Sequence, residues 1–402
     1  MANVVWLVSA LLVPLVWLGS LVAGVEGDMG HVLVAVLSGL AVVGAAFQLS
    51  WACELAEQDI PPALALIVLA LVAVLPEYAV DLHFAWVAGQ DPTSGYLEYA
   101  VANMTGANRV LIGIGWASLV IVMWFNNREK QLRVDDGQRL ELGFLLIATL
   151  YSFVLPLKQT ISVLDSAVFF GIFLTYVVRA MRSPHGSHDL VGPARWIDDR
   201  VDRGGRWAIV LGFLVYACAA IWFSAHHFAD SLVAIGRTAA VDEFILIQLV
   251  APLASEAPEF IVAILFVLRH RPSTALAALV SSKVNQWTLL IGALPIAYTI
   301  ARWSGGHVDV PTLSAMDLSN RQVAELLLTS AQSLFAVAVL ADLRFTLKEA
   351  LALAGLFVAQ WFFPGNLARY VFAGTYLVLV LIIGFGTRAK QQEFLRLLRA
   401  RQ

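Results

Sequence analysis

Two acidic residues of this chain follow a proline inside long apolar segments. Glu77 ends an LPE triplet and Glu259 ends an APE triplet. A proline inside a helix removes one backbone hydrogen bond and leaves a carbonyl oxygen free, so each triplet places a carboxylate beside a further oxygen. A charged group at the centre of a membrane helix costs about 2.5 to 3.5 kcal/mol. Two such positions indicate a function, and the chemistry that carboxylates offer there is the binding of protons or cations.

Each triplet is followed by a second apolar segment that contains a polar cluster. In both clusters a hydroxyl residue precedes an asparagine by three residues, and a glycine follows that asparagine by seven. The polar residues are Thr105, Asn108 and Arg109 in the first copy, and Ser282, Lys283, Asn285 and Gln286 in the second. We expect the two asparagines to hold helices together by hydrogen bonds rather than to touch an ion. The matching spacing indicates an internal repeat whose hydroxyl and amide oxygens could complete a cation site.

Further polar residues lie one helical turn from the glutamates. Glu256 precedes Glu259 by three residues and Asp81 follows Glu77 by four, so each shares a helix face with its neighbour. We expect Glu256 and the adjacent Ser255 to contribute to the site. For Asp81 two interpretations stay open, an extension of the site toward the outer mouth and an anchor at the membrane interface.

The composition assigns the chain to the class of integral membrane proteins. Of its 402 residues 59% are apolar and 14% are charged, and the mean hydropathy is +0.77. The formal net charge of -3 predicts no nucleic-acid partner. Motifs of zinc proteases, nucleotide-binding loops and nucleophile elbows are absent from the sequence, so we expect no enzyme and no cofactor. The expected partners are the lipid bilayer and small inorganic cations.

Apolar runs of the length that a bilayer requires predict an all-α, polytopic bundle of about 12 spans. The predicted spans cover residues 3–24, 30–53, 60–88, 96–125, 139–157, 159–180, 206–236, 241–268, 272–302, 320–340, 344–363 and 366–387. With a cytoplasmic amino terminus, nineteen of the 26 basic residues fall in or beside cytoplasmic loops and five outside. The positive-inside tendency therefore predicts that both termini are cytoplasmic. We expect the membrane to be a prokaryotic plasma membrane.

A long hydrophilic segment divides these spans into two halves of five, with one extra span at each end. An odd number of spans per unit inverts the second copy in the membrane, and inverted repeats place their ion site at the midplane where they meet. The predicted divisions are an extra span at 1–29, a first repeat at 30–180, a cytoplasmic linker at 181–206, a second repeat at 207–363, and an extra span with a basic tail at 364–402.

The repeated regions resemble the alpha-repeats of the sodium/calcium exchanger superfamily. The sequence DEFILIQLVAPLASEAPEF at 242–260, followed by SSKVNQWTLLIG, is similar to that family's SEFVIGLTIVALGTSLPE and GSNIxDIxxxxG. ALALIVLALVAVLPEYAVDL and MTGANRVLIGIG are similar to the first repeat, with a longer connection around residues 90–96. The chain is thereby identified as a divergent member, with alpha-repeat regions at 60–125 and 241–302. The resemblance implies a cation antiporter that works by alternating access around a midplane site.

The resemblance also implies roles for single residues. Glu77 and Glu259 match the principal cation ligands of the family, and Thr105 and Ser282 match residues that supply neutral oxygens. The chain departs from the family pattern at Ala73, Val74, Gly106 and Arg109 in the first repeat, and at Ser255, Glu256, Lys283 and Gln286 in the second.

These departures bring positive charge into the expected site. A calcium site needs about six to eight oxygen ligands, several of them anionic. Two like charges a few ångströms apart repel by roughly 4 kcal/mol at an effective dielectric near 20. Because Arg109 and Lys283 lie in or beside the expected site, the sequence puts ordinary calcium binding in doubt.

Three hypotheses account for the basic residues within spans. In the first, the chain is a proton- or sodium-coupled cation antiporter with altered ion selectivity, in which Arg109 pairs with Glu77, while Glu256, Glu259 and Lys283 form a proton-titrating exchange site. In the second, transport is lost, and both basic residues form structural salt bridges with the glutamates of a membrane sensor or scaffold. In the third, the two cations attract an anion or anionic solute. The first is preferred, and the transported cation stays open among Na⁺, H⁺ and Ca²⁺.

Overall fold

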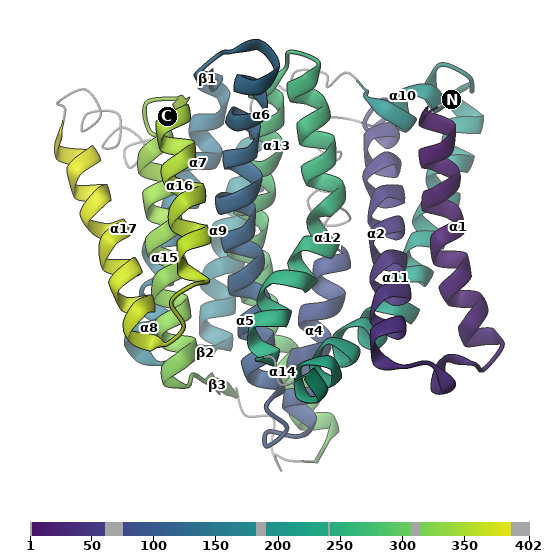
Figure 1. Ribbon diagram of the computed structural model, residues 1–402, viewed down its shortest axis with the longest axis horizontal. Helices are drawn as coiled ribbons and strands as arrows, with labels where there is room; N and C mark the ends of the chain where they lie inside the picture. Colours follow the sequence, from purple (N-terminus) through teal and green to yellow (C-terminus); the bar gives the residue numbers. More distant parts are fainter. Residues whose placement is uncertain (1, 61–74, 182–189, 240–241, 307–313, 387–402) are drawn as a thin grey trace.

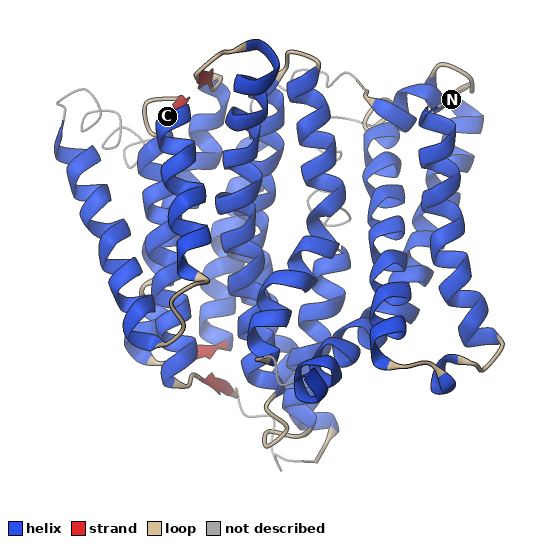
Figure 2. Cartoon of the chain, in the orientation of Figure 1, coloured by secondary structure: helices blue, strands red, loops and turns tan. Residues whose placement is uncertain are grey.

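The computed structural model of the chain describes residues 2–60, 75–181, 190–239, 242–306 and 314–386. These residues are almost entirely helical (Figure 1), and Figure 2 shows the few short strands between the helices. The first half contains α1 (Ala2–Val22), η1 (Glu26–Asp28), α2 (His31–Ala56), α4 (Leu75–Gln90), α5 (Tyr96–Val110), η2 (Leu111–Trp116), α6 (Ala117–Asn127), β1 (Gln131–Arg133), η3 (Asp136–Gln138), α7 (Arg139–Ser152), α8 (Val154–Lys158), β2 (Thr160–Ser162) and α9 (Val163–Ala180). The second half contains α10 (Gly192–Asp198), α11 (Arg203–Ala239), α12 (Glu243–Leu268), α13 (Pro272–Asn285), η4 (Gln286–Leu290), α14 (Ile291–Ser304), β3 (Ala315–Asp317), α15 (Asn320–Leu340), β4 (Arg344–Thr346), α16 (Leu347–Gln360) and α17 (Asn366–Gly386).

Ten segments of the described residues are helical, long and apolar enough to cross a membrane. They agree with the predicted spans except at 60–88 and 344–363. The structure has α4 and α16 at these places, and α16 has only 14 residues because residues 344–346 form β4 instead. α5, η2 and α6 form one rod of 32 residues, and α13, η4 and α14 form one of 33. The predicted all-α, polytopic membrane bundle is confirmed.

Two small sheets connect the halves of the chain at opposite ends of the bundle (Figure 2). β1 pairs antiparallel with β4, and β2 pairs antiparallel with β3. Counted from α2 in the first half and from α11 in the second, β1 and β3 each come before the fourth long helix or rod, whereas β2 and β4 each come before the fifth. Each sheet therefore pairs one connection with the non-equivalent connection of the other half. Two copies related by an inverted topology produce this exchange.

The equivalent helical rods of the two repeats are interrupted in the same way. A π-helical turn, η2 or η4, follows the polar cluster of each copy. π-helical turns inside α-helices are rare and occur frequently at functional sites. Their recurrence indicates that the two copies share a local backbone geometry as well as a spacing of polar residues.

The two repeats meet where α5 crosses α12. A Cβ atom on Gly106 would lie 2.0 Å from the backbone oxygen of Gln248, so this approach requires glycine. Small residues at membrane-helix contacts allow two backbones to approach closely. The crossing places polar residues of α5 beside those of α12 in the protein interior.

The helices predicted as extra spans lie at the two flanks of the bundle. α1 packs on α2, α17 packs on α15, and Figure 1 shows α1 and α17 on opposite sides. The start of α1, the helix α10 and the strand β1 all lie at the upper end of the bundle in that view. Most of the predicted cytoplasmic basic residues that are described belong to this end, and its assignment to the cytoplasm remains a prediction.

Parts of the sequence-based scheme lie outside the described residues. They are Ala73 and Val74 with the beginning of the span at 60–88, residues 182–189 of the linker, and the basic tail from 387 to 402. The domain limits between 29 and 364 remain predictions.

Candidate functional site

Glu77 lies in the first turn of α4 and is almost completely buried. Its side chain is 2% exposed, and its Oε1 has no hydrogen-bond partner within the described ranges. The charges of Asp81, Glu256, Glu259 and Lys283 all act on this carboxylate. Acidic groups from both repeats therefore lie near enough to one another inside the protein for their charges to interact.

The second repeat contributes two glutamates from α12, and each accepts a hydrogen bond from the next helical rod. Oε1 of Glu256 accepts from Nε2 of Gln286 at 3.0 Å, and Oε2 of Glu259 accepts from the hydroxyl of Ser282 at 2.9 Å. The hydroxyl of Ser255 donates instead to carbonyl oxygens of the preceding turn of α12. Ser282 and Gln286 thus orient the two carboxylates, whereas Ser255 bonds to its own helix.

Asp81 lies one turn beyond Glu77 on α4 and is fully enclosed by protein. Its Oδ1 accepts a hydrogen bond from Nδ2 of Asn103 at 3.0 Å, and its Oδ2 has no partner among the residues that the structure describes. Of the two interpretations left open by the sequence, the interfacial anchor is wrong, because an anchor would reach the surface. Asn103 was not predicted, although its place two residues before Thr105, in the same polar segment, was a signal for it.

Lys283 is fully buried on α13, and among the described residues no carboxylate lies within salt-bridge distance of it. Its ammonium group donates to Oδ1 of Asn108 at 2.5 Å and to the backbone oxygen of Asn108 at 3.2 Å. The ammonium nitrogen also lies 4.3 Å from the ring centre of Trp287. The salt bridge between Lys283 and a glutamate, which the second hypothesis from the sequence expects, is therefore wrong. Two neutral oxygens and an aromatic face solvate the ammonium group in place of a carboxylate.

Both predicted supporting asparagines bond to other helices. Asn108 of α5 accepts from Lys283 of α13, and Asn285 of α13 accepts a long hydrogen bond, 3.4 Å, from the hydroxyl of Tyr78 on α4. These contacts join the helices that carry the polar clusters to each other and to the helix of Glu77. The expectation that neither asparagine touches a bound ion remains a prediction.

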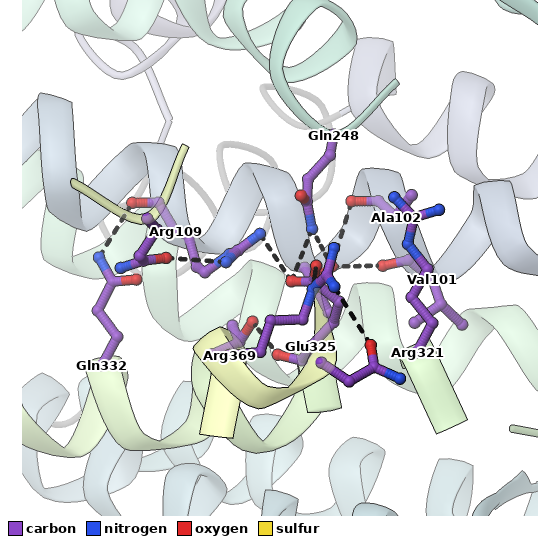
Figure 3. Close-up of polar contacts among 12 residues, drawn as sticks. Val101, Ala102, Arg109, Gln248, Arg321, Glu325, Gln332 and Arg369 are labelled. Atoms are coloured by element: carbon purple, nitrogen blue, oxygen red, sulfur yellow. Dashed lines mark hydrogen bonds and ion pairs between the residues drawn. The ribbon is translucent and has the colours of Figure 1, made fainter. Parts of the chain in front are cut away.

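Arg109 belongs to a second buried cluster, which Figure 3 shows in close-up. Its Nη2 lies 2.8 Å from Oε2 of Glu325 on α15, and its Nη1 donates to Oε1 of Gln360 at 2.9 Å. The other oxygen of Glu325 pairs with Arg369 on α17. The predicted pairing of Arg109 with Glu77 is wrong, because Glu325 supplies a buried carboxylate from a span outside the repeated motifs.

Thr105 also lies beside this second cluster. Its hydroxyl donates to the carbonyl oxygen of Val101 at 2.7 Å and accepts a hydrogen bond from Nε2 of Gln248 at 3.2 Å. The same amide nitrogen lies 3.0 Å from Oε2 of Glu325. Thr105 and Ser282 thus differ in their surroundings although they occupy matching positions of the two repeats: only Ser282 bonds to a glutamate of the repeated motifs.

The partners of Arg109 were missed in the sequence. Glu325 is the one acidic residue within the predicted span at 320–340, and an acid in an apolar span is a signal of a buried partner or a function. Arg369 is one of the five basic residues expected outside the membrane. It lies near the start of the last predicted span, and nothing in that position indicates a contact with α15. Nothing in the spacing of Glu325 and Arg369 connects them to Arg109.

Two clusters of opposite charge result. The acidic cluster consists of Glu77, Asp81, Glu256, Glu259 and Lys283, and the arginine cluster consists of Arg109, Glu325 and Arg369. With every group ionised, negative charge is in excess in the first and positive charge in the second. Buried charges of one sign are costly unless they are paired or neutralised. The acidic cluster can lower this cost by taking up protons or cations.

The carboxylates of the acidic cluster do not form a ready-made metal site. No three acidic, histidine or cysteine side chains of the described residues converge closely enough to hold a metal ion. A bound divalent cation would therefore require the carboxylates to close around it. Protons need no such convergence, because each carboxyl group can take one separately.

Comparisons with known proteins agree with the two repeats. The chain matches the family described as sodium/calcium exchanger protein over residues 30–182 and 209–364. It is similar to the crystal structure of the H⁺/Ca²⁺ exchanger CAX, with 43% sequence identity and a TM-score of 0.91 over 99% of this chain and 97% of that chain. No curated protein sequence matches the chain significantly.

Two more distant structures share the fold alone. The Ca²⁺/H⁺ antiporter protein YfkE is 13% identical, with a TM-score of 0.62 over 92% of this chain and 99% of that chain. The sodium-calcium exchanger NCX_Mj is 13% identical, with a TM-score of 0.54 over 83% of this chain and 98% of that chain. With the family match over both halves, these findings establish that the chain is an integral membrane protein of the sodium/calcium exchanger family of cation/calcium antiporters.

Proposed function

We propose that the chain exchanges protons for calcium ions across the membrane through the acidic cluster. The observation that carries this proposal is that three of its buried carboxylates each keep one oxygen without a hydrogen-bond partner among the described residues: Oε1 of Glu77, Oδ2 of Asp81 and Oε2 of Glu256. Such a carboxylate is neutralised either by its own proton or by a bound cation. The two states compete for the same oxygens, and this competition is the physical basis of proton-coupled antiport.

The relationship to proteins of known structure supports this choice of ions. The H⁺/Ca²⁺ exchanger CAX is 43% identical to the chain over nearly the whole of both sequences. We carry its pair of ions over to the chain. The likeness to the sodium-calcium exchanger NCX_Mj is too distant to carry an ion with it, so sodium coupling enters as an outcome of the experiment below.

The placement of the basic residues weakens the objection to calcium that the sequence raised. The charge of Arg109 is paired with Glu325 in the arginine cluster and does not stand beside Glu77 in place of an ion. Lys283 remains near the carboxylates, with its ammonium group held by Asn108. One basic residue rather than two therefore opposes a divalent cation.

The residues of the acidic cluster divide into three roles in this proposal. Glu77 and Glu259, one from each repeat, are the ligands that alternate between proton and calcium, and Glu256 adds a third carboxylate. Ser282 and Gln286 orient the carboxylates of α12 and offer neutral oxygens, which calcium accepts together with carboxylates. Lys283 is a fixed counter-charge that favours the ionised form of the carboxylates near it and competes with a bound cation for them. Movement of one set of helices against the other would then expose the site to each side in turn.

Transport by the purified full-length chain in liposomes tests the proposal. With an acidic lumen and calcium outside, outward proton flow should drive uptake of radioactive calcium, and a lumenal dye should report the accompanying rise in pH. Glu259→Gln should reduce uptake to that of protein-free liposomes, because its carboxylate can then neither ionise nor bind the cation. Glu243→Gln is the matched control, since Glu243 lies on the same helix and pairs with Arg237 near the surface.

Other outcomes identify what replaces the proposal. Calcium uptake that follows a sodium gradient and ignores the pH gradient would make the chain a sodium-coupled exchanger. Equal loss in the two variants would mean that the effect is structural. Silence of the wild-type chain toward every cation offered would favour the sensor or scaffold, and a flux of anions would favour the third hypothesis from the sequence.

A further inference from the structure

A small cavity borders the arginine cluster. It has a volume of about 40 Å³, and its polar lining comes from Arg109, Gln248, Glu325, Gln360 and Arg369. Apolar side chains of α12, α15, α17 and of residues 361–364 complete the wall. One water molecule needs roughly 10 to 15 Å³ of such space. The cavity is therefore large enough for a small ion and too small for an organic solute.

Two hydrogen-bond donors that line this cavity have no partner in the part of the chain that the structure describes. They are Nε of Arg109 and the indole Nε1 of Trp361, and both atoms are buried. Both oxygens of Glu325 already accept hydrogen bonds or ion pairs, and Gln360 accepts from Arg109. Among the described residues, the buried groups of the lining without a partner are thus donors only. Arginine and tryptophan side chains cannot accept a hydrogen bond, so the guest that satisfies them must be an acceptor.

The net charge of the arginine cluster also favours an acceptor, and one that carries negative charge. Arg109 and Arg369, whose side chains are 4% and 14% exposed, share the single carboxylate of Glu325. Arg321, which Figure 3 draws nearby, is paired with Asp242 at 2.7 Å and leaves this balance unchanged. One positive charge is therefore in excess in a largely buried place. An uncompensated buried charge is costly, and a single negative charge would cancel it.

We propose that this cavity binds a small monovalent inorganic anion, such as chloride, between Arg109, Trp361 and Arg369. The anion accepts hydrogen bonds from the N–H groups of Arg109 and Trp361 and neutralises the excess guanidinium charge. Arg369 is partly exposed, so the site can exchange its ion with the surrounding water. The bound anion would join α5 to the end of α16 and the start of α17. This site is distinct from the acidic cluster and does not depend on which cation the chain transports.

Thermal unfolding of the purified full-length chain tests the anion site. The unfolding temperature in sodium chloride should exceed that in sodium gluconate of equal ionic strength, with a saturable dependence on chloride that bromide reproduces. Trp361→Phe keeps the aromatic ring and removes one donor to the anion, so the half-saturating chloride concentration should rise about tenfold or more. Trp222→Phe is the matched control, because Trp222 is 77% exposed on α11, and it should leave the chloride response unchanged.

A second variant keeps the proposal testable if the first folds poorly. Arg369→Gln leaves the pair of Arg109 and Glu325 without excess charge, so the stabilisation by chloride should disappear, whereas Arg321→Gln should retain it. A crystal grown in bromide should show an anomalous peak inside the cavity. The same chloride response in wild-type, Trp361→Phe and Arg369→Gln proteins would overturn the proposal, as would a cavity that contains only water in the bromide crystal.

Discussion

The acidic cluster and the arginine cluster differ in how completely the oxygens of their carboxylates are paired. In the arginine cluster, Glu325 has a partner on each oxygen, and its contacts join α5, α12, α15 and α17. In the acidic cluster, by contrast, Glu77, Asp81 and Glu256 each keep an oxygen without a partner in the described part of the chain, and Lys283 bonds to an amide instead of a carboxylate. Paired charges stabilise one arrangement of helices, whereas unpaired carboxylates create a demand for protons or ions. The contrast teaches that buried charge alone does not locate a transport site, and that buried carboxylates with unpartnered oxygens are the better guide.

The largest difference between the clusters is expected in transport, when a carboxylate of the acidic cluster is replaced. Glu77→Gln should reduce proton-driven calcium uptake to background and change the free energy of unfolding by less than about 1 kcal/mol, because it removes a carboxylate that is repelled by its neighbours. Uptake assays in liposomes and thermal unfolding of the same preparation measure both quantities. A severe loss of stability in this variant would end the distinction between the clusters.

The largest effect on stability is expected in the arginine cluster. Glu325→Gln leaves two guanidinium groups without a carboxylate and should destabilise the protein by about 3–5 kcal/mol. Asp242→Asn is the control, since Asp242 is 40% exposed beside Arg321 and its loss should cost about 1 kcal/mol or less. Thermal or denaturant unfolding in detergent distinguishes them. Comparable small losses in the two variants would show that the cluster is not a structural anchor.

The helix crossing between the clusters should respond to a single methyl group. Gly106→Ala places a Cβ atom against the backbone of Gln248 and should destabilise the protein by about 1–3 kcal/mol, because neither backbone can move aside without separating α5 from α12. Gly212→Ala, where the added atom meets nothing within 4 Å, should leave stability nearly unchanged. Thermal unfolding of the two alanine variants measures the difference, and an equally stable Gly106→Ala protein would contradict the crossing as described.

The smallest effect comes from a carboxyl group outside both clusters. Burial raises the pKa of Glu57, just beyond the end of α2, from 4.5 to about 7. Because the folded pKa exceeds the unfolded one, the folded protein binds more protons between these values, so its stability should fall as the pH rises from about 4.5 to 7. Glu57→Gln should reduce this fall by about 1 kcal/mol, less than the full pKa shift would give, because solvent reaches the partly exposed side chain. The measurement is the free energy of unfolding against pH, and identical curves for both proteins would refute the assignment.

The clusters also show which contacts the sequence could and could not predict. The membrane spans, the inverted halves and the polar positions followed from the hydropathy pattern and from a spacing that occurs twice. The pairing of Arg109 was predicted wrongly because the nearest acid in the repeat pattern is Glu77, whereas its partner lies on α15. Lys283 was assigned to a glutamate for the same reason. Asn108 and Trp287, which contact Lys283 instead, carry no charge from which the contact could have been predicted.

By itself, the sequence determined that this chain crosses the membrane many times as two inverted copies and that it buries acidic and basic residues. Both properties depend on local composition and periodicity, which every short segment carries with it. Only the tertiary structure decided which acid each base meets, which oxygens stay unpartnered, and that the charges separate into two clusters. These outcomes depend on the packing of helices far apart in the chain, such as α5 against α15 and α17. A change of one residue in the register of such a helix would give each buried charge a different partner.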